Sequence, residues 1–384
     1  MKSFCSYFNE GICHSCTRIE LPYSEQLELK SKKLATLLNP KDSKTIVQLP
    51  SVSSKITGFR NKAKFSVTGS LENPIIGLTG TEELDEGRMI TNCPVHHPQI
   101  NSLLEDISEF INLARLTPYQ IKAKTGELKG LILYYSSETE EIYLRLILRS
   151  KESLDRIKKH SSFFLSQHPK IKSLSANIQP IAHAILEGEE EIFFTPQDYI
   201  AHQLGEVKMT LHPQGFVQTN QEVALKLYST AASWVKEIGA TTFLELFSGQ
   251  GAFSFFIQKE VKQALGVEIN AAAVERANKT SASNHWSHLK FIAEDAGKIK
   301  SELIHFAPEI VLVNPPRRGI SQARELLKEI HSPYIIYSSC EASTLAQDIE
   351  ELKDHYELMR YQLFDMFPHT DHFETLALLK RIKA

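Results

Sequence analysis

Short apolar segments alternate with helical segments through the second half of the chain, and this succession restricts the fold more than any other feature. The predicted strands, rich in β-branched and aromatic side chains, are residues 241–247, 263–269, 289–295, 309–316 and 334–339. The predicted helices are residues 252–259, 271–283, 321–330 and 344–354. This alternation predicts an open, doubly wound α/β sheet with parallel strands. Residues 356–367 and 374–381 predict a closing antiparallel pair at the edge of that sheet.

The segment before this α/β region has a different pattern. Its predicted strands are residues 63–70, 130–135 and 141–149, and its predicted helices lie around 100–114 and 154–167. This irregular order predicts a smaller α+β domain. The predicted division is an N-terminal cysteine segment (1–20), a charged helical segment that packs on the C-terminal domain (21–48), the α+β domain (49–208) and the α/β domain (209–384).

Composition excludes some classes of protein. No apolar run among the 384 residues approaches the roughly 18 to 20 residues that span a bilayer. Residues 1–10 lack the apolar stretch of a signal peptide, so we expect a cytosolic protein. The net charge of −3 gives no general affinity for nucleic acid. RNA binding would therefore require a local cluster of lysine and arginine.

Four of the five cysteines form a separable group. Cys5, Cys13 and Cys16 lie close together in the sequence, and Cys93 is a distant fourth. An odd number of cysteines in a cytosolic chain argues against a disulfide framework. It favours four metal ligands and one free thiol, which is Cys340. The spacing alone suits either zinc or an iron–sulfur cluster.

A glycine-containing loop follows the first predicted strand of the α/β domain. Gly249 and Gly251 let the backbone approach a ligand closely and leave amides free at the helix start. Glu268 ends the following strand, where an acid can hydrogen-bond the ribose hydroxyls of a nucleoside cofactor. A dinucleotide fingerprint needs a third glycine where this chain has Ser254. The loop therefore favours S-adenosylmethionine, which has no pyrophosphate, over NAD.

Two further polar positions follow the next strands. Asn314 precedes a rigid Pro315-Pro316 turn, and its carboxamide can donate to and accept from the edge of a nucleobase. Arg317 stands where amino-methylating enzymes have an aromatic residue, which argues against methylation of an exocyclic amine. Cys340 follows a strand and precedes a helix, a position whose amides favour the thiolate. Adjacent parallel strands would bring Asn314 and Cys340 to one crevice.

The segment 58–65 interleaves basic and aromatic residues, among them Phe59, Arg60, Lys62 and Lys64. This mixture is typical of surfaces that bind phosphates and stack on unpaired bases. The same alternation is equally typical of a strand with one solvated basic face and one core face.

Together these segments resemble one enzyme family along nearly the whole chain. The motifs are the N-terminal cysteine group, GFRNKAK, FVQTN, LFSGQG, VEIN, NPPRRG, SSC and DMFPHTDHFET. They resemble the RNA 5-methyluracil methyltransferases, and within that family the enzymes that act on uridine 747 of 23S ribosomal RNA. The resemblance implies a Rossmann-like, S-adenosylmethionine-dependent methyltransferase domain, preceded by an α+β domain that carries a cysteine cluster and binds RNA.

The resemblance also implies roles for individual residues. Cys340 is then the nucleophile, and Glu374 is the base that abstracts a proton. The implied cofactor contacts are Gln218, Phe247, Glu268 and Asn314, with the loop glycines Gly249 and Gly251. The implied ligands of a 4Fe–4S cluster are Cys5, Cys13, Cys16 and Cys93. Many relatives have aspartate in place of Asn314 and Asn-Pro in place of residues 341–342.

The sequence leaves alternatives open. The same chemistry could act on another 23S uridine or on the T-loop of tRNA. The cysteines could hold zinc, with His14 replacing one of them. The chain could also be an inactive iron–sulfur protein that binds RNA, although the joint presence of Cys340, Glu374 and the glycine loop speaks against this. We expect a monomer.

Overall fold

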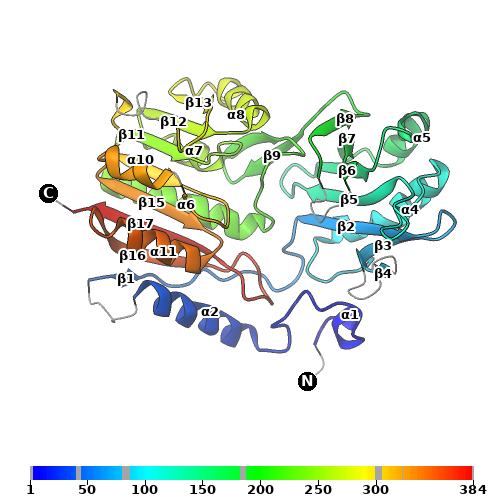
Figure 1. The fold of residues 1–384 in the computed structure, drawn as a ribbon, viewed down its shortest axis with the longest axis horizontal. Coiled ribbons are helices and arrows are strands. Elements are labelled where there is room, and N and C mark those ends of the chain that lie inside the picture. Colours follow the sequence, from blue (N-terminus) through cyan, green and yellow to red (C-terminus); the bar gives the residue numbers. More distant parts are fainter. Residues whose placement is uncertain are drawn as a thin grey trace. The chain divides into compact units, whose positions relative to one another are not determined.

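The computed structural model describes residues 3–39, 45–79, 87–181, 187–298, 305–321 and 323–382. The chain divides into two compact units, whose elements are labelled in Figure 1. Unit 1 comprises Met1–Cys16, Lys55–Gln203 and Met209–Pro213. Unit 2 comprises Thr17–Ser54, Leu204–Lys208 and Gln214–Ala384. None of the described helices is long and apolar enough to cross a membrane.

Unit 2 is built on an eight-stranded sheet with the order β1-β16-β17-β15-β14-β11-β12-β13. Its strands are β1 (Val47–Gln48), β11 (Thr242–Leu246), β12 (Gln263–Glu268), β13 (Leu289–Ala293), β14 (Ile310–Val313), β15 (Tyr334–Ser339), β16 (Tyr356–Phe364) and β17 (Glu374–Arg381). Neighbouring strands are parallel except where β17 pairs with β15 and β16. The predicted α/β sheet is therefore confirmed.

Helices cover both faces of this sheet. They are α2 (Tyr23–Leu38), α6 (Gln221–Ile238), α7 (Ala252–Ile257), α8 (Ala271–Ser283), α10 (Ala323–Glu329) and α11 (Ala342–Leu352). Leu34 and Leu38 of α2 share a core cluster with side chains of α10 and α11 and with Leu244 and Leu246 of β11. Phe243 alternates with these leucines and is buried as well, on the opposite face. The sheet is thus doubly wound.

The predicted antiparallel pair of the last two strands is confirmed, but the pair lies next to the edge of the sheet and not at it. β17 lies between β15 and β16, and the two-residue strand β1 pairs outside β16. The first six residues of β17 are buried because the strand has neighbours on both sides and helices on both faces. Its first residue, Glu374, is among them.

Unit 1 is built on a seven-stranded sheet with the order β4-β3-β2-β5-β6-β7-β8. Its strands are β2 (Lys62–Gly69), β3 (Pro74–Thr79), β4 (Gly87–Met89), β5 (Leu128–Tyr135), β6 (Ile142–Leu148), β7 (Ile171–Ile178) and β8 (Glu190–Phe193). Only β6 and β7 pair in parallel, and helix α5 (Leu154–Gln167) connects them. Strands β9 (Ile200–Leu204) and β10 (Val207–Leu211) form a separate two-stranded sheet.

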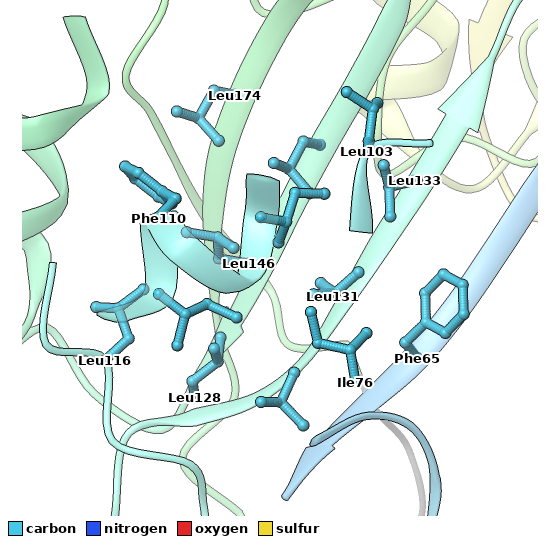
Figure 2. Packing of buried hydrophobic residues seen from close by; sticks show 14 of the residues in the cluster. Phe65, Ile76, Leu103, Phe110, Leu116, Leu128, Leu131, Leu133, Leu146 and Leu174 are labelled. Atoms are coloured by element: carbon cyan, nitrogen blue, oxygen red, sulfur yellow. The ribbon is translucent and has the colours of Figure 1, made fainter. Parts of the chain in front are cut away.

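The core of unit 1 lies between its sheet and the two helices α4 (Leu104–Leu113) and α5. The other described helices of the unit are the short α1 (Ser6–Asn9) and α3 (Pro98–Asn101). Phe110 of α4 packs among Leu146, Leu174 and other apolar side chains of the sheet (Figure 2). Its ring stacks on Phe164 of α5, with 4.6 Å between the ring centroids. This packing holds α4 against strands β6 and β7 and against α5.

Candidate active site and cysteine group

Five of the predicted site residues lie along one edge of the unit 2 sheet. Phe247, Asn314 and Cys340 directly follow β11, β14 and β15, and Glu268 is the last residue of β12. Glu374 begins β17, which runs antiparallel and so starts at the same edge. Neighbouring strands are about 4.8 Å apart, so Cys340 and Glu268 are separated by roughly 14 Å. That span accommodates a nucleobase and a nucleoside cofactor side by side.

Cys340 lies beside Glu374 because β15 and β17 pair with Ser339 opposite Thr375. Burial raises the pKa of the Cys340 thiol, and the charge of Glu374 raises it further. The guanidinium of Arg317 hydrogen-bonds the thiol and opposes both effects. Sequence reasoning assigned no catalytic role to Arg317, although its place directly after the Asn-Pro-Pro turn was a usable signal.

A backbone amide does favour the Cys340 thiolate, because a backbone hydrogen bond lowers the pKa of the thiol, but burial and the charge of Glu374 outweigh this effect and the net shift of the pKa is upward. Helix α11 has Glu341 as its N-cap, and the carboxylate of Glu341 accepts a hydrogen bond from the Ser343 amide. This negative charge offsets part of the positive field at the helix start. Burial disfavours the charged thiolate as well. The cation that stabilises a thiolate here is Arg317.

Glu374 is a buried carboxyl group, with 3% of its surface exposed. Burial raises its pKa to about 7, against the opposing effects of a Gln218 hydrogen bond and the Arg317 charge. Gln218 Nε2 donates to Glu374 Oε1 at 3.4 Å. Glu374 Oε2 has no hydrogen-bond partner among the described residues. A carboxylate that titrates near neutral pH with one oxygen unpaired suits the work of a general base.

Replacing Glu374 by Gln should stabilise the protein more at about pH 8.5 than at about pH 5. The folded-state pKa of about 7 lies above the ordinary 4.5, so folding favours the protonated carboxyl group. Ionisation therefore costs stability as the pH rises from 4.5 through 7, up to about 3 kcal/mol. Glutamine does not ionise and keeps an acceptor for Gln218. Thermal unfolding of both proteins at the two pH values measures the difference, and an equal change in Tm at both would contradict the assigned pKa.

The glycine loop borders open space at its first glycine. A Cβ atom on Gly249 would meet nothing within 4 Å. The Gly249 amide donates to Glu268 Oε2 at 3.0 Å, and the Asn270 amide donates to Oε1 at 2.9 Å. Gly251 has a φ of +86°, and a Cβ there would lie 2.7 Å from the Phe291 ring. The first glycine therefore leaves room for a ligand, and the second is required by packing.

The structure also explains why a third glycine is absent. Ser254 donates through its backbone N and its Oγ to Glu245 Oε2, at 3.0 and 2.5 Å. These bonds tie the start of α7 to β11. Nearby, the buried Ser248 Oγ has no partner among the described residues. An unpaired hydroxyl beside open space fits a bound nucleoside, which supplies hydrogen-bonding groups.

The remaining predicted cofactor contacts differ in their surroundings. Phe247 has a left-handed backbone, with φ +60°, a strained conformation that is common at functional sites. Asn314 is partly exposed, and its amide donates to the Leu246 carbonyl at 3.3 Å. Gln218 is buried, and its carboxamide contacts Glu374, so it lies near the predicted general base.

The cysteine group, Cys5, Cys13, Cys16 and Cys93, lies entirely in unit 1. Burial, together with the charges of the other three cysteines, raises the pKa of Cys16 to about 12. Backbone amides of Val95 and His96 hydrogen-bond Cys93. The other three thiols therefore lie within electrostatic range of Cys16. Within the described ranges, however, no three His, Cys, Asp or Glu side chains are close enough to hold a metal ion.

The basic stretch at residues 58–65, which leads into β2, does not form one solvated patch. Phe59 is 7% exposed, so the structure does not support the prediction that its ring stacks on a base. Arg60 lies beside the cysteine group, where burial lowers its pKa and the charges of Cys93 and Cys16 raise it. Burial lowers the pKa of Lys62 to about 8. Lys64 pairs with Glu187 at 2.6 Å.

Comparison with known proteins gives consistent matches. Residues 22–382 match the family model described as tRNA (Uracil-5-)-methyltransferase. The 23S rRNA (uracil(747)-C(5))-methyltransferase RlmC of Glaesserella parasuis is 38% identical over 382 residues, 98% of this chain and 97% of that protein. The protein of the same name from Proteus mirabilis is 39% identical over 378 residues, 98% of each chain.

A solved structure matches both units. It is the tRNA (uracil-54, C5)-methyltransferase of Pyrococcus abyssi in complex with S-adenosyl-L-homocysteine. The TM-score is 0.79 at 26% identity, and the match covers 95% of this chain and 85% of that one.

Proposed function

Because the chain belongs to the tRNA (uracil-5-)-methyltransferase family, we propose that it methylates carbon 5 of uridine 747 in 23S ribosomal RNA, with S-adenosylmethionine as methyl donor. The observation that carries the proposal is the pairing of Cys340 with the buried Glu374, on the same sheet edge as an open glycine loop. The name shared by two relatives at 38 and 39% identity supports the choice of target. A ribosomal substrate is consistent with a cytoplasmic protein, which we expect to be a monomer.

The chemistry needs a nucleophile because carbon 5 of uracil is too weakly nucleophilic to take the methyl group unaided. The Cys340 thiolate adds to carbon 6, and the resulting enolate carries electron density at carbon 5. S-adenosylmethionine supplies the electrophilic methyl group. Glu374 then removes the proton from carbon 5. The electrons of that C–H bond re-form the ring double bond, and the Cys340 thiolate leaves.

The neighbouring side chains adjust the two reactive groups. The positive charge of Arg317 stabilises the Cys340 thiolate and the ionised form of Glu374. Gln218 donates a hydrogen bond to one oxygen of Glu374, so the other, unpaired oxygen can face the uracil ring. Asn314 directly follows β14, the strand between those that lead to Cys340 and to the glycine loop, a position from which its carboxamide can orient the uracil edge.

Nucleoside mapping tests the proposal. Purified protein, S-adenosylmethionine and 23S rRNA from a strain that lacks this chain should give 5-methyluridine at position 747. The main alternative is the T-loop of tRNA, which the name of the Pyrococcus abyssi structure favours. Methylation of unmodified tRNA but not of 23S rRNA would support that alternative. An absence of 5-methyluridine in both RNAs would contradict the activity itself.

We propose further that the cysteine group holds a 4Fe–4S cluster. The support is the electrostatic coupling of the four thiols in one unit and the amide hydrogen bonds to Cys93. Two contacts tie this N-terminal segment to its surroundings. Tyr7 Oη accepts from the Asn92 amide at 3.0 Å, and Arg88 donates to the Ile12 carbonyl at 3.0 Å. Metal binding would therefore stiffen the segment from residue 88 to residue 93.

Protein purified without oxygen should contain about four iron atoms per chain, with acid-labile sulfide. Cys93→Ser should lower the iron content and weaken RNA binding, because the loop beside the N-terminal segment loosens. Its affinity for S-adenosylmethionine should be unchanged. Cys340→Ala is the matched control, since it removes the one cysteine outside the group and should keep full iron. Zinc without sulfide in the wild-type protein would contradict the cluster.

A further inference from the structure

Unit 1 contains a pocket that the chemistry described above does not use. Its volume is about 810 Å³, and it lies among α3, α4, strands β3 and β4 and the loop at residues 91–97. Cys93 is the only member of the cysteine group that lines it, so the pocket is distinct from the space between the four thiols. Its size falls within the range of pockets that bind small molecules or single nucleotides.

Part of the pocket wall is formed by apolar side chains. Three prolines are among them, Pro74, Pro94 and Pro98, together with Met89. Met89 is exposed to 47%, although it is a large apolar side chain. Rigid rings and an adaptable thioether form good packing surfaces for a planar group.

Two buried polar side chains of the pocket pair only weakly. His96 Nδ1 and Asn101 Oδ1 make no well-formed hydrogen bond in the described part of the chain, although Asn101 lies close enough to His96 to oppose, through a side-chain hydrogen bond, the lowering of the His96 pKa by burial. Asn101 Nδ2 donates to the Cys93 carbonyl at 2.9 Å. The His96 ring is held edge-on against Phe65, 5.4 Å away. A ligand or water that pairs better with these two atoms would stabilise the site.

This combination suits an unpaired nucleobase. A base has two flat apolar faces, which match the proline and methionine walls, and an edge with donors and acceptors, which matches a carboxamide and an imidazole. One cation lies near the pocket, since the charge of Arg60 acts on the lining residue His96, and one acid, Glu105, lines the pocket. Such a cation can pair with a phosphate next to the base.

We propose that this pocket binds one unpaired nucleotide of the RNA substrate, other than the uridine that is methylated. The inference depends on the proposed function, because it requires an RNA substrate. Thr91 and Asn92 line the pocket, and their amides donate to Tyr7 of the cysteine segment, at 3.2 and 3.0 Å. The pocket therefore links RNA selection to the order of that segment.

Filling the pocket tests the proposal. Ser108 of α4 lines it, so Ser108→Trp should occupy the space of a base. The Kd for the RNA that the wild type methylates should rise about 10- to 100-fold, the effect of losing one stacked base. The kcat at saturating RNA and the affinity for S-adenosylmethionine should not change. The control is Ser162→Trp, at an exposed serine of α5 that does not line the pocket.

A second variant and a set of modified RNAs complete the test. Ser102→Trp also fills the pocket and replaces Ser108→Trp if that protein does not fold. RNAs with single abasic positions should reveal one unpaired nucleotide, besides the target, whose base the wild type needs and the filled variant does not. Unchanged RNA affinity in the filled variant, or an equal loss in Ser162→Trp, would overturn the pocket assignment. A wild type that methylates no RNA would instead overturn the proposed function.

Discussion

Cys340→Ala is expected to lower the rate of uridine methylation by about 10⁴-fold or more, because the methyl side chain of alanine cannot add to carbon 6 of uracil. The affinity for S-adenosylmethionine should stay within about twofold of the wild type. The glycine loop lies two strands from β15 and Glu268 three, and the substitution removes only one sulfur atom. Single-turnover methylation and equilibrium binding measure the two quantities.

Ser338→Ala is a suitable control for this substitution. Ser338 lies on the same strand, is fully buried and has no hydrogen-bond partner for its Oγ among the described residues. Its replacement should leave the methylation rate nearly unchanged. A rate for Cys340→Ala close to that of Ser338→Ala would exclude a covalent role for the thiol.

Glu374→Gln should lower kcat by about 10²- to 10⁴-fold, the usual contribution of a general base. Addition and methyl transfer precede proton removal, so the variant should accumulate a covalent RNA–protein adduct. A denaturing gel would show it as a slowly migrating band. In the wild type the rate should rise with pH through about 7, because burial raises the pKa of Glu374 to about 7 and the base acts when ionised.

Asp371→Asn is the matched control for the base. It makes the same change from carboxylate to amide three residues earlier, but Asp371 is 54% exposed and pairs with Arg18 at 2.8 Å. This variant should turn over at nearly the wild-type rate and form no stable adduct. If Asp371→Asn accumulated the adduct and Glu374→Gln did not, the role of base would belong to Asp371.

Periodicity predicts the regular elements of this fold well. The helix at residues 271–283 and the strand at 374–381 have the bounds of α8 and β17. Strand β7 was not predicted, because polar residues interrupt its run of apolar side chains. Ser175 and Asn177 of β7 bond the carboxylate of Glu191, which also pairs with the fully buried Arg145. A buried network of hydrogen-bonded polar side chains produces no regular alternation of apolar and polar residues in the sequence.

The candidate site shows the same limit. Motifs single out Cys340 and Glu374, but they contain no information on burial or on the charges nearby. The upward pKa shift of Cys340 comes from its burial, from Glu374 across a strand pair and from the balance with Arg317. Phe59 likewise is of a residue type that is common in RNA contacts, but it is buried in the core. These properties depend on tertiary contacts between segments distant in the sequence.

The covalent bond between Cys340 and the target uridine is the most direct test of the mechanism. Glu374→Gln would be incubated with the RNA substrate and S-adenosylmethionine that carries a deuterated methyl group. After digestion with nuclease and protease, mass spectrometry should find the peptide of Cys340 joined to a uridine nucleotide that has gained the labelled methyl. An unmodified Cys340 peptide, together with labelled 5-methyluridine released free in the RNA at the wild-type rate, would contradict the account.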